Sequence, residues 1–598
     1  MAVVIDPEAL RQKYREERDK RLRPDGNDQY IRMVDHFPDY LDDPYMPVVQ
    51  RAPKTDHVTF AFVGGGFAGL VTGARLKESG VTDVRIVDKG GDFGGTWYWN
   101  RYPGAQCDTA SLVYMPLLEE TGHMPIEKYA HAPEILEHCR RIANRYGLYD
   151  NALFHTEVTA LDWDEARAVW VIGTDRGDHF TASYVGVGIG PLHVPKLPGI
   201  PGIGSFGGHA FHTSRWDYAY TGGDPSGKAM TKLRDKRVGV IGTGATAVQI
   251  VPELAAACRE LYVFQRTPSS VDVRDNHPTD PAWFAGIATP GWQERWLDNF
   301  AENQSFAFPE EDLVMDGWTD IGRRIRSRVL EAGLSDFSRE AIMAAFEQSD
   351  FEKMEEIRGR VDAIVKDPTT AAHLKAWYRQ LCKRPCFHDE YLQAFNQPNV
   401  HLVDTDGKGV ERITAGGVVV AGEEYPLDCI VYASGFETGT EFEHRSGFEI
   451  VGRDGETLSQ HWRDGMRSMH GVHMHGFPNL FMVQLFQGAN LISNVPHNLN
   501  DAARTVAGVV AHASETDSTR VEVTQEAEEA WMQLISSGQN LLQAPDCTPG
   551  YYNNEGHADD PQIRSLVGYP MGASAYFQYI REWRASGGFE GLEFRRSS

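Results

Sequence analysis

The sequence predicts an α/β fold with two parallel-sheet domains, a helical insertion and a helical extension at the N-terminus. Two observations predict the paired domains. The apolar segments 58–63 and 237–241 have the composition of short, buried parallel strands. Each is followed by a glycine-rich turn and a helix-like stretch, the order found in Rossmann-like dinucleotide-binding domains. We therefore expect two such domains, although a sheet with tight turns and no ligand has the same local pattern.

The first glycine cluster runs from Gly64 through Gly66 to Gly69 and has the G-x-G-x-x-G spacing. Backbone N–H groups at the start of the following helix can face a pyrophosphate. The next strand-like segment, 84–87, ends in Asp88, whose carboxylate can accept hydrogen bonds from a free ribose. These residues indicate a first dinucleotide site.

The second cluster contains Gly242 and Gly244, with Ala247 in place of the last glycine, a permitted variant. The strand-like segment that follows it ends in Arg266, at the same spacing as Asp88 in the first copy, and Thr267 comes next. A guanidinium suits a 2′-phosphate, because it donates two parallel hydrogen bonds. The second dinucleotide is therefore expected to be phosphorylated, the alternative being an Arg266 that forms a salt bridge.

Composition narrows the class of protein. The hydrophobic fraction of 41% and the charged fraction of 24% are those of a soluble globular protein, and no run approaches the length of a membrane span. The net charge of −26 argues against a nucleic-acid partner and favours a cytoplasmic location. The seven cysteines are scattered, which favours a reducing compartment, and Cys382 and Cys386 lack the second pair that a zinc site needs. No metal is expected.

The order of segments predicts the domain organisation. Asp6 and Pro7 are a helix-start signal, and Leu10 and Tyr14 then share one face of that helix. Helix formers and tryptophans dominate after residue 275, and strand-like runs return near residue 400. The expected parts are 1–57 as an N-terminal extension, 58–193 and 429–598 as the first dinucleotide domain, 194–274 and 379–428 as the second, and 275–378 as a helical insertion.

A longer pattern lies between the two glycine clusters. Phe206, Gly208, His212, Trp216 and Asp217 fill F-x-G-x-x-x-H-x-x-x-W-[PD], position by position. In this pattern the chain resembles Baeyer–Villiger monooxygenases. A second pattern of that family, [AG]-G-x-W-x-x-x-x-[FY]-P-[GM]-x-x-x-D, is filled by Gly94, Gly95, Trp97, Tyr102, Pro103, Gly104 and Asp108. The resemblance covers nearly the whole chain from about residue 58 onward.

The resemblance implies FAD in the first site and NADPH in the second, with a ketone and O2 as the other reactants. In the family, NADPH reduces the flavin, a C4a-peroxyflavin forms, and its attack on the carbonyl yields an ester or lactone. By resemblance, Arg384 is the catalytic cation and Asp108 the acid that orients it, while Lys383 helps to hold the 2′-phosphate. A fixed cation facing developing negative charge is the expected main catalytic contribution. Without the resemblance, Lys383 and Arg384 would be interpreted as a surface pair that forms salt bridges. Asp108 would be interpreted as a residue that caps a turn.

The resemblance also implies roles for residues around the flavin and the linker. His212 and Trp216 belong to a linker that matters for domain motion and cofactor handling, although a lone histidine in a linker is usually structural. Trp97 and its aromatic neighbours are expected in the flavin wall, or else in a core cluster. Segment 490–498 resembles a flavin-facing loop, or else forms an exposed turn. The full set of expected cofactor-binding residues is Gly64, Gly66, Gly69, Asp88, Gly95, Thr96, Trp97, His212, Trp216, Gly242, Gly244, Ala247, Arg266, Thr267 and Lys383.

Several residues differ from the family pattern, and some of these differences indicate one branch of the family. Gln106 stands where many members have arginine, and Asp88 is shorter than the usual glutamate. Segment 551–554, Tyr-Tyr-Asn-Asn, replaces a common Trp-Tyr. This segment and the long N-terminal extension resemble the cyclopentadecanone monooxygenase branch, which implies bulky or large-ring cyclic ketones as substrates. One alternative is a flavin oxygenase of amines or sulfides, which the Arg384 and Asp108 pair and the Trp216-Asp217 signature disfavour. The other is a catalytically silent flavoprotein, which the intact glycines, Arg384 and Arg266 disfavour. The sequence leaves the oligomeric state open.

Overall fold

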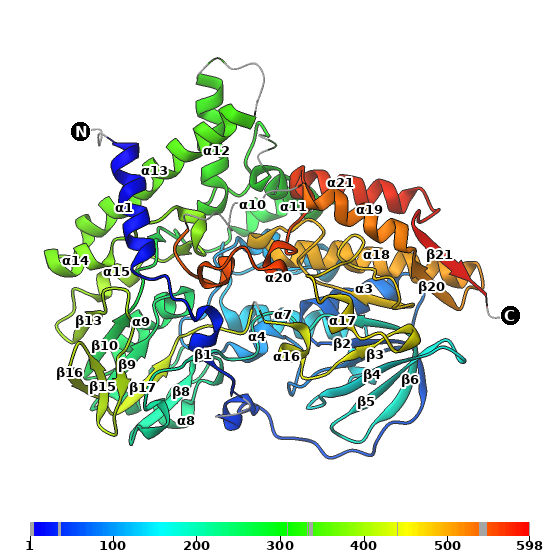
Figure 1. The fold of residues 1–598 in the computed structure, drawn as a ribbon, viewed down its shortest axis with the longest axis horizontal. Helices are drawn as coiled ribbons and strands as arrows, with labels where there is room; N and C mark the ends of the chain where they lie inside the picture. The colour runs from blue at the N-terminus through cyan, green and yellow to red at the C-terminus, as the bar shows by residue number, and fades with distance from the viewer. Residues whose placement is uncertain are drawn as a thin grey trace.

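The computed structural model of the protein describes residues 5–33, 37–305, 307, 309–331, 333, 339–438, 440–537 and 547–596. Two sheet-containing halves lie side by side, with a group of helices above them (Figure 1). Among the described residues, no helix has both the length and the apolar character needed to cross a membrane.

The first half is built on a mixed sheet in the order β18-β4-β5-β6-β2-β3, with β19 also paired to β6. β2 pairs in parallel with β3 and β6, whereas β5 is antiparallel to both of its neighbours. The strands span β2 His57–Val63, β3 Val84–Val87, β4 Val158–Asp164, β5 Val169–Thr174, β6 His179–Val187, β18 Ile450–Val451 and β19 Leu480–Met482. β2 and β3 therefore fall where the apolar segments predicted them.

The second half is built on a fully parallel sheet in the order β13-β10-β9-β17-β8. Its strands span β8 His209–His212, β9 Arg237–Ile241, β10 Glu260–Gln265, β13 Val400–Asp404 and β17 Cys429–Tyr432. The expected boundary at residue 429 is therefore placed too early, because β17 pairs with β9 and β8 in this sheet. An apolar run identifies a buried strand but not the sheet that it joins.

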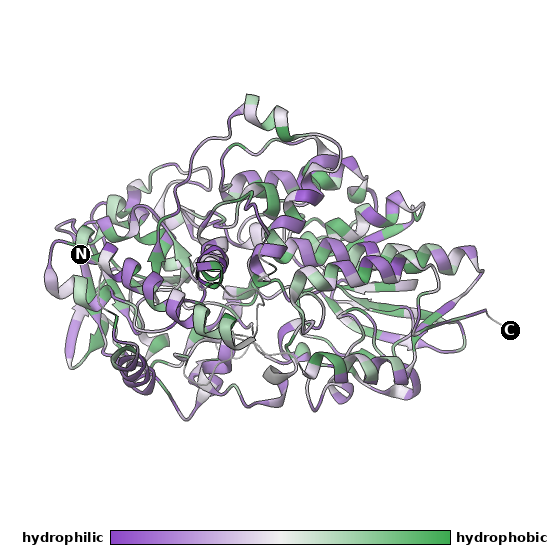
Figure 2. Cartoon of the chain, turned by 90° about the horizontal axis from the view of Figure 1, so that it is seen from above, coloured by the Kyte–Doolittle hydropathy of each residue, from purple (hydrophilic) through white to green (hydrophobic). Residues whose placement is uncertain are grey.

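Helices cover both sheets and carry the hydrophobic core between the layers. In the first half, α3 (Phe67–Glu78) packs against α18 (Val495–Glu515) and α7 (Ala132–Arg145). In the second half, α9 (Ala245–Ala257) packs on β9 and β10. Hydrophilic and hydrophobic residues alternate along the outer helices, as in amphipathic helices that bury one face (Figure 2). The packing of these helices on the two sheets thus places the N-termini of α3 and α9 at the two glycine turns.

The segment expected to be a helical insertion contains a series of helices above the two sheets (Figure 1). α12 packs against α13, and α11 contacts α21 of the C-terminal region. Their bounds are α10 Pro281–Ile287, α11 Trp292–Gln304, α12 Gly317–Glu331, α13 Arg339–Ile364, α14 Pro368–Leu374 and α21 Gly572–Ala585. This segment therefore bridges the second half and the C-terminal helices.

The N-terminal extension begins with the expected helix, α1 (Pro7–Asp19), and the Asp6 side chain accepts hydrogen bonds from the first-turn amides. Leu10 and Tyr14 are buried, and Tyr14 packs on Phe351 of α13. The chain then forms η1 (Gly26–Gln29) and β1 (Tyr30–Ile31), which pairs with β7 (Leu197–Pro198). The extension up to residue 31 thus runs from the helical segment to the linker that enters the second half, and the chain then continues through η2 (Pro38–Leu41) to β2 of the first half.

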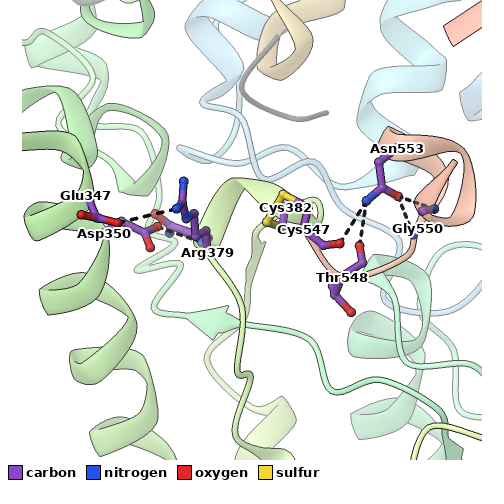
Figure 3. The surroundings of a disulfide bond; sticks show 10 residues. Glu347, Asp350, Arg379, Cys382, Cys547, Thr548, Gly550 and Asn553 are labelled. Atoms are coloured by element: carbon purple, nitrogen blue, oxygen red, sulfur yellow. Dashed lines mark hydrogen bonds and ion pairs between the residues drawn. A yellow bond between two sulfur atoms is a disulfide. The ribbon is translucent and has the colours of Figure 1, made fainter. Parts of the chain in front are cut away.

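A disulfide joins Cys382 to Cys547 across 165 residues of sequence (Figure 3). The expectation that the cysteines stay reduced is wrong for this pair, because sequence spacing gives no sign that the fold brings them together. The other five cysteines are free and buried.

The remaining elements span α4 Thr96–Trp99, α5 Ser111–Tyr114, α6 Leu118–Thr121, η3 Leu148–Asn151, η4 Ile203–Ser205, η5 Thr213–Arg215, α8 Tyr218–Thr221, η6 Thr231–Leu233, β11 Val271–Asp272, η7 Gln380–Cys382, β12 Cys386–Phe387, α15 Tyr391–Ala394, β14 Arg412–Ile413, β15 Gly417–Val420, β16 Glu423–Pro426, α16 Phe442–Ser446, η8 Arg453–Gly455, α17 Leu458–His461, η9 Ile492–Asn494, β20 Arg520–Val523, α19 Gln525–Ser536, η11 Tyr551–Gly556, α20 Pro561–Arg564 and β21 Leu592–Arg595.

Candidate active site

A cavity of about 1110 Å³ reaches from the first glycine turn to the second. Such a volume slightly exceeds the usual range of about 300–1,000 Å³ for small-molecule and cofactor sites. Most of the site residues expected from the sequence line it, namely Gly64, Gly66, Asp88, Gly95, Thr96, Trp97, Gly242, Gly244, Arg266, Thr267, Lys383 and Arg384. The two predicted dinucleotide sites therefore share one cavity.

The first glycine turn forms a cradle that has no room for side chains. Gly64 has φ +115°, and a Cβ atom there would lie 2.4 Å from the carbonyl oxygen of Gly188. Gly66 is the N-cap of α3, so the free first-turn amides of that helix are directed at the cavity. Asp88 accepts hydrogen bonds from the amides of Gly65 at 2.5 Å and Gly90 at 2.6 Å, which fixes its carboxylate. This geometry fits the pyrophosphate and ribose of a dinucleotide.

The second turn repeats the same geometry. Gly242 also has φ +115°, and a Cβ atom there would lie 2.3 Å from the carbonyl oxygen of Ala433. Gly244 is the N-cap of α9. The buried hydroxyl of Thr267 has no hydrogen-bond partner among the residues that the structure describes, although it borders the cavity. A buried polar group of this kind needs a partner, and a bound phosphate would supply one.

Arg384 and Asp108 form a bidentate ion pair beside the cavity. The two terminal nitrogens of Arg384, Nη1 and Nη2, each donate to one carboxylate oxygen of Asp108 at 2.6 Å. Burial lowers the pKa of Arg384, but the Asp108 charge and its hydrogen bonds outweigh burial and hold that pKa well above its usual value. The Asp108 side chain is 3% exposed and that of Arg384 33%. The carboxylate is thus hidden, while the cation it holds borders the cavity.

The wall near this pair is aromatic. The indole N–H of Trp318 donates to the Asp108 carbonyl oxygen at 2.9 Å, and the Arg384 guanidinium lies 5.6 Å from the Trp318 ring centre. Trp97, Tyr551 and Tyr552 also line the cavity. Trp318, from the helical segment, was missed in the sequence because nothing near it in the chain marks it as a site residue.

Gln106, which stands where many family members have arginine, lies next to the guanidinium of Arg274. The Arg274 guanidinium donates to the Gln106 side-chain oxygen, and the Gln106 amide donates to the Tyr129 carbonyl oxygen at 2.7 Å. Arg274 is buried. A residue far away in the sequence therefore places a positive charge beside Gln106.

Segment 490–498 is part of the cavity wall and not an exposed turn. Ser493 lines the cavity, Asn494 is fully buried, and Thr109 donates to the Ser493 carbonyl oxygen at 2.7 Å. Both polar atoms of the Asn494 side chain lack hydrogen-bond partners in the part of the chain that the structure describes. The turn alternative for this segment is therefore wrong.

Five of the expected site residues lie behind the cavity wall: Gly69, Asp108, Ala247, His212 and Trp216. His212 is buried, its Nδ1 lies 2.9 Å from the Ser214 hydroxyl, and burial lowers its pKa to about 3. Trp216 donates to the Thr221 hydroxyl at 3.1 Å and packs on Phe211. Neither of these two linker residues lines the cavity, and the second ring nitrogen of His212, Nε2, has no hydrogen-bond partner among the described residues.

A cluster of charges surrounds Arg266. The guanidinium donates to the Gln29 side-chain oxygen at 2.6 Å and to the Glu555 carboxylate at 3.2 Å. Lys196 and Lys383 are near enough to affect the pKa of Glu555. Burial, and then the Arg266 charge, lower the pKa of Lys383 to about 8. Sequence reasoning found Arg266 and Lys383 but missed Gln29, Glu555 and Lys196, which come from three separate segments.

Fold and site together define a protein with two dinucleotide cradles and an arginine–aspartate pair on one cavity. Residues 61–281 match the family model described as pyridine nucleotide-disulphide oxidoreductase. Neopentalenolactone D synthase of Streptomyces avermitilis is 50% identical to the chain, covering 99% of this chain and all of that protein. A Baeyer–Villiger monooxygenase of Streptomyces coelicolor is 48% identical, covering 97% and 96%.

Solved structures of other proteins are also similar to the chain. The polycyclic ketone monooxygenase of the fungus Thermothelomyces thermophila superposes with a TM-score of 0.91 at 41% identity, covering 98% of this chain and 99% of that one. A structure of OTEMO in complex with FAD and NADP has a TM-score of 0.72 at 25% identity, covering 90% and 100%. The chain belongs to the Baeyer–Villiger family of flavin monooxygenases, enzymes that use FAD and NADPH to convert ketones into esters or lactones.

Proposed function

We propose that this enzyme inserts oxygen into bulky cyclic ketones, with Arg384 as its catalytic cation. The observation that carries the proposal is the Arg384–Asp108 pair, with both hydrogen bonds at 2.6 Å and the cation on the cavity that both glycine turns line. A preorganised cation in a site that excludes water stabilises negative charge better than water does. This arrangement favours oxygen insertion over the alternative of a catalytically silent flavoprotein, because a silent protein needs no such cation.

Each residue has a distinct task in this proposal. FAD, when bound at the first turn, supplies hydride acceptance from NADPH and the activation of O2. Arg384 faces the negative charge that develops on oxygen during insertion and keeps its proton, because its pKa stays far above neutral pH. Asp108 holds the guanidinium in one orientation through two hydrogen bonds. Trp318 holds the backbone of Asp108 in place and covers one side of Arg384.

NADPH is proposed to bind at the second turn with its 2′-phosphate at Arg266. Support comes from the Thr267 hydroxyl that lacks a partner among the described residues and from the positive charges of Arg266 and Lys383 beside it. Lys383 directly precedes Arg384 in the chain. NADPH binding and oxygen insertion would therefore be served by adjacent residues.

The substrate is proposed to be a polycyclic or large-ring ketone. Relatives at 41–50% identity are named as a neopentalenolactone D synthase and a polycyclic ketone monooxygenase. The Tyr551-Tyr552 pair, with ring centres 4.5 Å apart, lines the cavity in place of the common Trp-Tyr. This pair also supports the proposed likeness to the cyclopentadecanone monooxygenase branch.

A product screen tests this proposal. Purified enzyme with FAD is supplied with NADPH, air and a panel of polycyclic, large-ring and small-ring ketones, plus one sulfide and one amine. We expect polycyclic or large-ring ketones to gain one oxygen atom as lactones, with the highest kcat/KM in the panel. Oxygenation of the sulfide or the amine alone would refute ketone insertion, and a preference for the small ring would refute the substrate class.

We also propose a cytoplasmic location, which the net charge of −26 and the five free, buried cysteines support. The Cys382–Cys547 disulfide is uncommon in a reducing compartment. Trapping the thiols of cell extracts with an alkylating agent tests whether this pair is oxidised where the enzyme works.

A further inference from the structure

Glu555 is a buried carboxylate on the guanidinium that is proposed to bind the 2′-phosphate. Its side chain is 5% exposed, and its Oε2 atom accepts from Arg266 Nη2 at 3.2 Å. The other terminal nitrogen of Arg266 donates to Gln29 at 2.6 Å. Both terminal nitrogens, the ones that would grip a phosphate, thus already have acceptors from the protein.

The charges around Glu555 show that it is ionised. Burial raises the pKa of this carboxyl, but Arg266, Lys196 and Lys383 outweigh burial and hold the pKa below its usual value. Lys196 is itself buried, donates to Asn27 at 3.0 Å and lies 3.7 Å from the Tyr30 ring centre. A single carboxylate therefore faces three cations, a surplus of positive charge that suits an anion with more than one negative charge.

The backbone that presents Glu555 is strained. Asn554 and Glu555 have φ of 52° and 54°, in the left-handed region, which non-glycine residues rarely adopt. Glutamate gains no local hydrogen bond there of the kind that makes asparagine tolerant of this conformation. Such strain persists only where surrounding contacts impose it. Here the Glu555 amide donates to the Gly550 carbonyl oxygen at 2.9 Å, and the Glu555 carboxylate pairs with Arg266.

The rest of the loop is held independently of Glu555. The disulfide anchors Cys547 to the residue before Lys383 (Figure 3). The Asn553 side chain accepts from the amides of Gly550 and Gly556 and donates to the Thr548 carbonyl oxygen at 3.1 Å. A change in the Glu555 side chain therefore does not release Tyr551 and Tyr552 from the cavity wall.

We propose that Glu555 competes with the 2′-phosphate of NADP for Arg266 and thereby sets the discrimination between NADP and NAD. A phosphate monoester carries up to two negative charges, and it cannot share the guanidinium with an ionised carboxylate without repulsion. Binding of NADP thus requires Glu555 to leave Arg266, whereas NAD leaves the pair intact. Glu555 is a specificity-determining residue that weakens NADP binding and speeds its release. The inference rests on the proposed role of Arg266 as the 2′-phosphate ligand.

The test measures dissociation constants by calorimetry on FAD-loaded protein with NADP⁺ and NAD⁺. Glu555→Gln keeps the shape and removes the charge, so the Kd for NADP⁺ should fall about fivefold to tenfold, the upper value corresponding to about 1.4 kcal/mol. The Kd for NAD⁺ should change less than about twofold. Glu522→Gln is the matched control, because Glu522 is equally buried and paired with arginines but lies outside the cavity lining.

Each result supports or overturns a specific statement. Arg266→Ala should raise the Kd for NADP⁺ far more than that for NAD⁺, and an equal rise would refute the proposed 2′-phosphate site itself. If Arg266→Ala discriminates but Glu555→Gln leaves the Kd for NADP⁺ unchanged or higher, the competition is refuted. Should Glu555→Gln fail to fold, Glu555→Asp withdraws the carboxylate by one methylene group at a backbone position that aspartate tolerates, and it should tighten NADP⁺ binding in the same sense.

Discussion

Asp108→Asn is the most informative perturbation of the active site, because it removes one charge and keeps the side-chain shape. Asp108 accepts two hydrogen bonds from Arg384 at 2.6 Å each and is 3% exposed. Breaking a fully buried ion pair costs about 3–5 kcal/mol. Arg384 is 33% exposed and the asparagine oxygen still accepts one hydrogen bond, so a loss of about 2–3 kcal/mol is expected, the value of one charged hydrogen bond.

This loss should affect oxygen insertion and not hydride transfer. A misoriented Arg384 that costs about 2–3 kcal/mol in the transition state lowers the rate of ester formation about 30-fold to 150-fold. The assay pairs anaerobic flavin reduction by NADPH in a stopped-flow instrument with the ester formed per NADPH oxidised in air. We expect the reduction rate to stay within about threefold of wild type while the ester yield falls and hydrogen peroxide accumulates.

A control separates orientation from general damage. Asp501 is also buried and pairs with Arg584 at 2.7 Å, but it does not line the cavity. Asp501→Asn should lower thermal stability by a similar amount and leave the ester yield unchanged. The reasoning is refuted if Asp108→Asn keeps the wild-type ester yield, or if it slows flavin reduction as much as ester formation.

Two further predictions concern the neighbours of Arg384. Burial lowers the pKa of Lys383 to about 8, so its positive charge is lost as the pH rises through that value. NADP⁺ binding should then weaken by about 1 kcal/mol, or about fivefold, and Lys383→Arg should abolish this pH dependence in a titration of Kd against pH. The disulfide between Cys382 and Cys547 closes a long loop, so replacing both cysteines by serine should lower the free energy of unfolding by about 3–5 kcal/mol. Denaturant unfolding with and without a reducing agent measures this, and equal stability of the oxidised and reduced protein would contradict it.

The sequence predicts the parts of the fold that depend on local patterns. The strands before both glycine turns and the helix that begins after Asp6 lie where short-range signals place them. β17 was assigned to the wrong half, because strand composition carries no information about pairing partners.

Contacts between distant segments escaped prediction for the same reason. Arg266 is separated in the chain by 237 residues from Gln29 and by 289 residues from Glu555. No periodicity or spacing links these residues, and nothing in the sequence of the N-terminal extension indicates that Gln29 lies beside the second dinucleotide cradle. The resemblance to a family supplied Arg384 and Asp108, but it did not supply the acid that faces Arg266.

Arg384→Ala tests the central claim most directly, that a cation held by Asp108 carries oxygen insertion. The variant is mixed with NADPH without oxygen and then exposed to air with a ketone that the wild-type enzyme converts. The account predicts flavin reduction at close to the wild-type rate, consumption of NADPH with release of hydrogen peroxide, and no detectable ester. Ester formation at a wild-type yield per NADPH would contradict the assignment of Arg384.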